Sequence, residues 1–139
     1  MRFIKLLAVT LLAGAVIACI AILPSRLCFN GAESYTFFCG DTSKNCREIT
    51  TKENADGLKI SLSDICGECA VYDVMDIAAF LKSVNGKIKF TETLSDSVNY
   101  YCSADLPYSV TLYGEEINLH ICVKTEKITV ASPIIFGGY

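Results

Sequence analysis

An uncharged apolar run from Leu6 to Leu23 constrains this 139-residue chain more than any other sequence feature. In a helix that rises about 1.5 Å per residue, about eighteen residues just span a hydrocarbon core about 30 Å thick. Arg2 and Lys5 precede the run, and Pro24-Ser25-Arg26 follows it. The pattern predicts an N-terminal transmembrane or signal helix, which places the rest of the chain outside the cytosol.

Three interpretations of this segment stay open, and all of them make the body of the chain extracytoplasmic. An uncleaved single-pass anchor is favoured because the run exceeds the usual signal-peptide core of about 7–15 residues. Cleavage after Ala13-Gly14-Ala15 or near Asn30-Gly31-Ala32 would instead give a secreted protein. Val16-Ile17-Ala18-Cys19 also passes as a loose lipobox, and Arg26 weakly opposes the outward orientation.

Residues 1–31 are therefore assigned to the signal or anchor, and residues 32–139 to one small domain with a single core. Three of the twelve basic residues precede residue 32, which leaves nine against all fifteen acidic residues. A net charge of about −6 on this domain argues against binding nucleic acid or anionic lipid through bulk charge. The membrane is the expected partner of the N-terminal helix.

The first half of this domain is expected to hold two strands and two loops. Ser34 to Cys39 alternates between apolar and polar residues, and a second short strand follows near Arg47 to Thr50. Thr50 to Leu58 is polar and predicts a loop. Cys66 to Cys69 are placed in a further loop.

One amphipathic helix of about three turns is expected next. Asp73 is its predicted N-cap, and Asp76 adds favourable charge at the N-terminus. Asn85-Gly86 supplies the stop. Its apolar positions are Val74, Ile77, Ala78, Leu81 and Val84.

From Lys87 onward the apolar residues recur at every second position, which predicts antiparallel strands. A two-residue turn at Gly114-Glu115 would pair Val110 with Leu119 and Leu112 with Ile117. A turn at Thr125-Glu126 would pair Val123 with Ile128 and Ile121 with Val130. Both registers put the aliphatic residues on one face, so we predict an α+β fold in which the helix covers a sequential β-meander. The expected strands are Lys87 to Thr91, Val98 to Ser103, Tyr108 to Tyr113, Glu116 to Lys124 and Lys127 to Ile135.

The last third of the chain resembles YwmB-like proteins, an exported family of Gram-positive bacteria with a TATA-box-binding-protein-like fold. The residues that carry the resemblance are Tyr101-Cys102, Leu112-Tyr113-Gly114, Ile117 to Ile121 and Thr129 to Ile135. The resemblance implies a helix on a curved antiparallel sheet in the cell envelope, and it implies no reaction and no catalytic residues. It does not imply DNA binding for an acidic domain beyond a membrane segment.

Eight cysteines are an excess for this length, and in an oxidising compartment they favour disulfides. The candidate disulfide or redox residues are Cys39, Cys46, Cys66 and Cys69. Cys39 and Cys46 flank a short loop, and Cys66-Gly67-Glu68-Cys69 is a C-x-x-C motif that suits a local bridge, paired free thiols or redox chemistry. Cys19 is expected to be an apolar residue of the run, and Cys28 is either free or paired between chains.

Metal and hydrolytic chemistry have little support in this sequence. Cys66, Cys69, His120 and Cys122 are the only set with which a zinc site could be closed, and His120 is expected on the surface of a strand. Cys102 and Cys122 can bridge only if the strand order is not sequential. With no metal or cofactor predicted, the expected function is a non-catalytic binding or scaffolding module of the cell envelope that contacts an envelope protein. A thiol–disulfide redox protein using Cys66 and Cys69 is the alternative.

Overall fold

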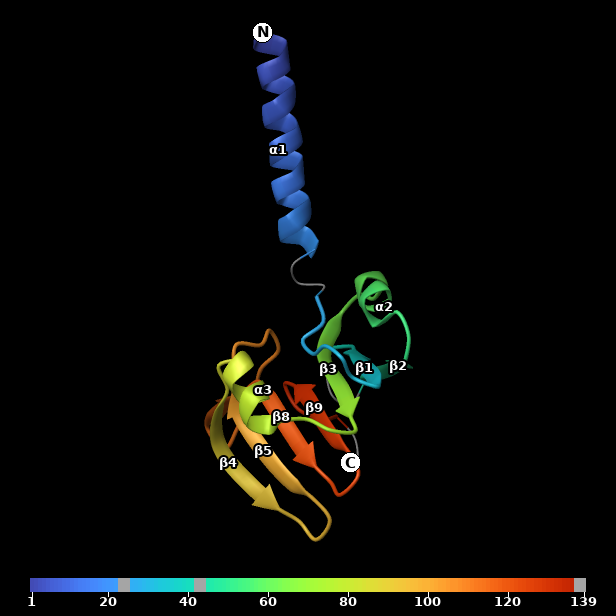
Figure 1. The fold of residues 1–139 in the computed structure, drawn as a ribbon, viewed down its shortest axis with the longest axis vertical. Coiled ribbons are helices and arrows are strands. Elements are labelled where there is room, and N and C mark those ends of the chain that lie inside the picture. Colours follow the sequence, from blue (N-terminus) through green and yellow to red (C-terminus); the bar gives the residue numbers. More distant parts are fainter. Residues whose placement is uncertain (23–25, 42–44, 137–139) are drawn as a thin grey trace.

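The computed structural model describes residues 1–22, 26–41 and 45–136. Helix α1 (Arg2–Ile22) begins the chain and projects away from the rest of it (Figure 1). No helix within the described residues is long and apolar enough to cross a membrane. Leu23, Pro24 and Ser25, where the predicted membrane segment ends, lie outside the described residues, so the membrane segment stays a prediction.

The body of the chain has the predicted α+β architecture, with one large antiparallel sheet. The strand order in this sheet is β2-β1-β3-β9-β8-β5-β4. Short helices α2 (Ala55–Ser61) and α3 (Ile77–Ser83) complete the body, and β6 (Val110–Leu112) pairs with β7 (Glu115–Ile117) in a separate ribbon. The seven strands of the sheet are β1 (Ser34–Cys39), β2 (Arg47–Thr51), β3 (Ile65–Tyr72), β4 (Lys87–Thr93), β5 (Val98–Ser103), β8 (Leu119–Val123) and β9 (Ile128–Ser132).

The predicted sequential meander is wrong because the β6–β7 ribbon leaves the sheet and lets β5 pair directly with β8. Asn118 marks the break: its amide side chain binds both backbone groups of Ala104, and its backbone N–H donates to the Cys102 carbonyl at 3.1 Å. Tyr113 (φ 51°) and Gly114 (φ 81°) form the ribbon's turn. Positive φ at both central positions is the type I′ pattern, so the turn lies one residue earlier than predicted.

The registers of the two C-terminal turns therefore divide. Val110 pairs with Ile117 and Leu112 with Glu115, which corrects the predicted partners Leu119 and Ile117. The β8–β9 register is confirmed, with Val123 opposite Ile128 and Ile121 opposite Val130. The shift by two residues in the first turn keeps every side chain on its predicted face, because the side-chain period of a strand is two.

Two segments predicted as loops are regular structure. Most of Thr50 to Leu58 belongs to β2 or α2, and α2 buries Ala55 and Lys59 against the core. Cys66 to Cys69 lie inside β3, which pairs with β1 and β9. A central strand is covered on both faces, so its residues need not alternate, and that is why the strand escaped detection.

The helix predicted from Asp73 is shorter than expected. Its N-cap is Asp76, whose Oδ1 accepts the Ala79 N–H at 3.0 Å. The stop at Asn85-Gly86 is confirmed, since Asn85 has φ 53° and the Gly86 N–H donates to the Leu81 carbonyl at 2.7 Å. Asp73 is therefore not the cap.

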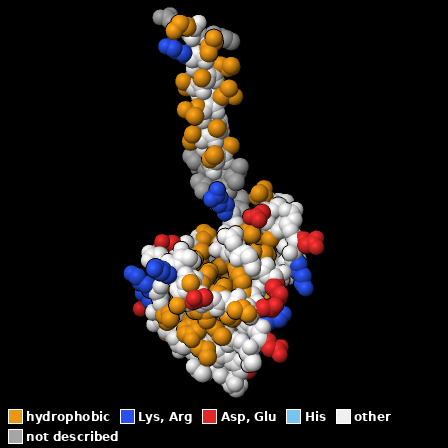
Figure 2. All heavy atoms as spheres, viewed as in Figure 1, with side chains coloured by type: hydrophobic (Ala, Val, Ile, Leu, Met, Phe, Trp, Pro, Cys, Tyr) orange, Lys and Arg blue, Asp and Glu red, His pale blue; other side chains and the backbone are white. Residues whose placement is uncertain are grey.

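Both faces of the sheet carry packed apolar residues. Phe29, Phe37, Leu119 and Ile121 lie in the larger cluster, against which α3 packs, with the rings of Phe29 and Phe80 at 6.1 Å. Residues of the segment 26–31, which the sequence groups with the anchor, thus contribute to the domain core. Apolar side chains are visible across the middle of this face in Figure 2. A smaller cluster on the other face contains Phe38, Cys69 and Ala131, with Ile135 and Phe136 packed against it.

Candidate functional site

A buried ion pair joins the segment after α1 to the domain. The Lys59 ammonium and the Glu68 carboxylate are 2.7 Å apart, and both side chains are fully buried. Glu68 Oε1 also accepts the backbone N–H groups of Cys28 (2.9 Å) and Phe29 (3.4 Å), while the Lys59 ammonium donates to the Arg26 carbonyl. Residues 26–29 are thereby bound to α2 and β3 through charge-assisted hydrogen bonds, the strong class of such bonds.

The surroundings of this pair suit a structural role. Burial alone would lower the pKa of Lys59, but the neighbouring Cys28 and Glu68 outweigh it, so the pKa is raised and the ammonium stays charged. Burial and the Glu68 charge raise the pKa of the Cys28 thiol to about 12. A thiol with that pKa is a poor nucleophile, because the thiolate is the reactive form.

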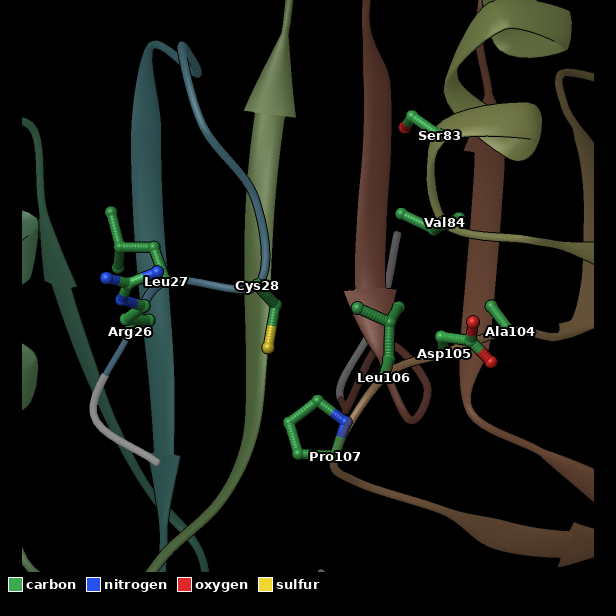
Figure 3. A pocket seen from close by; sticks show the side chains of 9 residues that line it. All are labelled: Arg26, Leu27, Cys28, Ser83, Val84, Ala104, Asp105, Leu106 and Pro107. Carbon is green, nitrogen blue, oxygen red and sulfur yellow. The ribbon is translucent and has the colours of Figure 1, made fainter. Parts of the chain in front are cut away.

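A groove of about 710 Å³ lies beside this segment, between Arg26, Leu27 and Cys28 on one wall and the end of α3 and residues 104–107 on the other (Figure 3). Many of its polar groups already have partners. The Asp105 N–H donates to the Val84 carbonyl at 2.8 Å, the Asn85 side chain reaches Asp105 Oδ2 at 3.4 Å, and the Arg26 carbonyl binds Lys59. The groove thus has few polar groups left to orient a ligand.

A second hollow, the aromatic pocket, has a volume of about 500 Å³. The rings of Phe90 and Tyr101 stack at 4.5 Å, and Tyr113 meets Phe90 edge-on at 5.7 Å and 75°. Tyr113 is 95% exposed at the tip of the β6–β7 turn, and the Tyr101 hydroxyl donates to Glu92 at 3.4 Å. Its lining residues are Phe90, Glu92, Tyr101, Thr111, Leu112 and Tyr113. Aromatic walls with a few polar groups are typical of binding pockets.

Strand β4 forms one side of this pocket and also one edge of the large sheet. Among the described residues, no strand pairs with its outer edge. All of its side chains except that of Phe90 are exposed, including the apolar Ile88 at 48%. An unpaired edge of seven residues can accept a further strand.

The cysteines lie differently from either predicted pairing. All eight are free thiols in the structure. The sulfur–sulfur contact recorded among the described residues joins Cys46 to Cys66 at 4.0 Å. Burial raises the pKa of Cys69 to about 12, and burial followed by the neighbouring Cys66 raises that of Cys46. The C-x-x-C motif lies on a strand, and α3 begins only at Ile77, so neither thiol has the helix N-terminus that lowers the pKa in redox enzymes.

The prediction that His120 lies on the surface is wrong. His120 is 1% exposed, and burial lowers its pKa to about 4. Its Nδ1 accepts the Ile135 N–H at 3.3 Å, so its Nε2 carries the proton and donates to Asn99 Oδ1 at 3.1 Å. The outer face of β8 is covered because the segment after β9 folds back across it, and a strand pattern carries no information about such a cover.

The structure does not group the residues considered for zinc. Cys122 lies opposite Asn99, whereas Cys102 lies opposite Leu119, so the two cysteines are three residues out of register although β5 and β8 are neighbours. Within the described part of the chain, no three or more His, Cys, Asp or Glu side chains form a group that could hold a metal ion. Asn99 Nδ2 is the one buried side-chain nitrogen or oxygen there without a hydrogen-bond partner.

The fold and these sites define an α+β domain with two surface hollows and a cysteine pair. No family model, no curated protein and no solved structure matches this chain. The resemblance to YwmB-like proteins therefore stays a prediction that rests on the strand residues alone.

Proposed function

We propose that this chain is a non-catalytic binding module of the cell envelope, held at the membrane by its N-terminal helix or released by its cleavage. Its partner is an envelope protein, which adds an extended segment to the edge of β4 and inserts a side chain into the aromatic pocket. The observation that carries the proposal is the combination of an unpaired edge strand with a pocket of three aromatic rings beside it.

The chemistry of this surface favours a polypeptide. Backbone hydrogen bonds to an edge strand supply affinity that is independent of sequence, and a neighbouring pocket supplies specificity through alternate side chains. Tyrosine is enriched among the residues that dominate binding energy at interfaces. Tyr113 places its whole side chain in solvent, where it contributes little to the core and is available to a partner.

The alternative, a thiol–disulfide redox protein using Cys66 and Cys69, has less support. A redox catalyst needs an accessible thiolate near neutral pH. Cys69 is buried with a pKa of about 12, and Glu68 between the two cysteines contributes to raising it.

The predicted location is tested by labelling intact cells with a membrane-impermeant maleimide, before and after treatment with a reductant. Labelling of the chain on intact cells, at either stage, is the expected result. Labelling only after lysis would refute the extracytoplasmic location.

The binding surface is tested by photo-crosslinking in intact cells, with p-benzoylphenylalanine in place of Tyr113. The matched control carries the same group at Thr125, an exposed residue of the β8–β9 turn. We expect a discrete adduct from position 113 only, which disappears when Ile88→Pro is added to disrupt the β4 edge. Identical adducts from both positions, or none from position 113, would refute the proposed surface.

A further inference from the structure

We infer that Cys46 and Cys66 form a disulfide when the domain is in an oxidising compartment. Their sulfur atoms are 4.0 Å apart, and both side chains are partly buried against Phe38, Cys69 and Ala131. A disulfide requires sulfurs about 2.05 Å apart, so the two must approach by about 2 Å, which side-chain rotation supplies. The inference does not involve the proposed binding surface, which lies at the opposite edge of the sheet.

The backbone at the end of β1 brings the two cysteines together. Strand β1 separates β2 from β3, but it ends at Cys39, and Cys46 lies just before β2 begins. Gly40 has φ 146°, and a Cβ there would lie 2.8 Å from the Asn45 carbonyl oxygen and 3.3 Å from the Cys46 Cα. Only glycine therefore lets residues 45 and 46 pass close enough to reach the start of β3.

A β-bulge aims Cys66 at this position. Phe38 pairs with Gly67 and Cys39 with Ile65, so Cys66 is the extra residue of β3 between two paired positions. Its thiol lies 3.4 Å from the Phe38 carbonyl, on the face that carries the smaller apolar cluster. Bulges commonly re-aim one side chain in this way.

The competing pairs have poorer geometry. Cys66 and Cys69 are three residues apart on one extended strand, which separates their Cα atoms by about 10 Å, beyond the limit of about 7 Å for a disulfide. Cys39 and Cys46 are close along the hairpin, but Cys39 packs in the larger cluster on one face of the sheet and Cys46 packs on the other.

The oxidant is a disulfide, either a small-molecule disulfide such as oxidised glutathione or that of a thiol oxidase. The Cys46 thiolate attacks it, forming a mixed disulfide and releasing one thiolate. The Cys66 thiolate then attacks the Cys46 sulfur and releases the second thiolate. The two cysteines lose two protons and two electrons, and the oxidant disulfide becomes two thiols.

Peptide mapping of the full chain tests this pairing. The chain in detergent micelles is oxidised with oxidised glutathione, its free thiols are alkylated, and it is cut with trypsin and an endoproteinase that cleaves after glutamate. A Cys46–Cys66 bond joins residues 45–47 to residues 60–68, and this is the expected product. A Cys66–Cys69 bond would join 60–68 to 69–82, and a Cys39–Cys46 bond would join 34–44 to 45–47. Either of these as the main product, or alkylation of both Cys46 and Cys66, would overturn the inference.

Variants provide a second measurement. Cys39→Ser should keep the bond between residues 45–47 and 60–68, whereas Cys66→Ser should leave Cys46 alkylated. Oxidation should raise the unfolding midpoint of the unsubstituted chain by on the order of 10 °C, because the bond closes a loop of about twenty residues. The Cys46→Ser/Cys66→Ser double variant should lose this shift, and a shift of equal size in that variant would contradict the assignment. If a variant fails to fold, the map of the unsubstituted chain still decides the pairing.

Discussion

Replacing Lys59 by methionine should lower the free energy of unfolding by about 3–5 kcal/mol, the usual cost of removing one partner of a buried ion pair. Methionine matches the length and volume of the lysine stem, so packing is largely kept. What is lost is the 2.7 Å contact with Glu68 and the hydrogen bond to the Arg26 carbonyl. Glu68 remains buried, held only by the backbone N–H groups of Cys28 and Phe29.

The size of this effect follows from the contacts. A hydrogen bond to a charged group contributes about 1.5–3 kcal/mol, and leaving a buried acceptor such as the Arg26 carbonyl unsatisfied costs about 1–3 kcal/mol. Their sum agrees with the range for broken buried pairs. It is a large share of the roughly 5–15 kcal/mol that stabilises a typical domain.

Denaturant unfolding of the full chain in detergent micelles, followed by circular dichroism, measures the loss. The matched control is Lys89→Met, which removes the exposed pair of Lys89 with Glu115 and should cost less than about 1 kcal/mol. The Lys59→Met/Glu68→Leu double variant should recover much of the loss, because it leaves no unpaired charge. A cost for Lys59→Met no larger than that of Lys89→Met would refute the role assigned to the buried pair.

Three further predictions follow from the packing. The pKa of His120 is about 4 in the folded chain against about 6.5 unfolded, so the unfolded state binds the extra proton and stability falls by up to about 3 kcal/mol as the pH drops from about 6.5 to 4. His120→Gln should flatten this part of a plot of unfolding free energy against pH, and an unchanged slope would contradict it. Phe29→Ala should cost about 3–5 kcal/mol in denaturant unfolding, since the ring is 1% exposed, and a cost under about 1 kcal/mol would exclude it from the core. Asn118→Ala removes both side-chain bonds to Ala104 and should cost about 1–3 kcal/mol in thermal unfolding, whereas Asn118→Asp, which keeps only the acceptor, should fall between the two.

Local chemistry could be predicted where neighbours in sequence decide the structure. The β8–β9 register followed from a short turn and alternating aliphatic residues, and the end of α3 followed from Asn85-Gly86. Strands β1 and β2 were visible for the same reason. The candidate cysteines 39, 46, 66 and 69 could be named, but their pairing could not, because it depends on Gly40 and on a bulge between strands that are distant in sequence.

One missed site left a signal in the sequence. Glu68 is a lone charge within the mostly apolar segment Ile65 to Tyr72, and a charge in such a segment calls for a buried partner. Nothing in the sequence identified Lys59 as that partner, since it lies in a stretch that was partly predicted to be a loop. The aromatic pocket was foreshadowed only by the number of tyrosines in the C-terminal strands.

The sequence by itself determined the α+β class, two of the strand pairs and the end of α3, because turn residues and side-chain periodicity act over a few residues. Only the tertiary structure decided that β5 meets β8 and that β3 meets β9, because non-local strand pairing depends on which surfaces can be buried together. The burial of His120 and the contact of Cys46 with Cys66 have the same origin. In both cases a segment distant in sequence covers a strand face or reaches past a strand end.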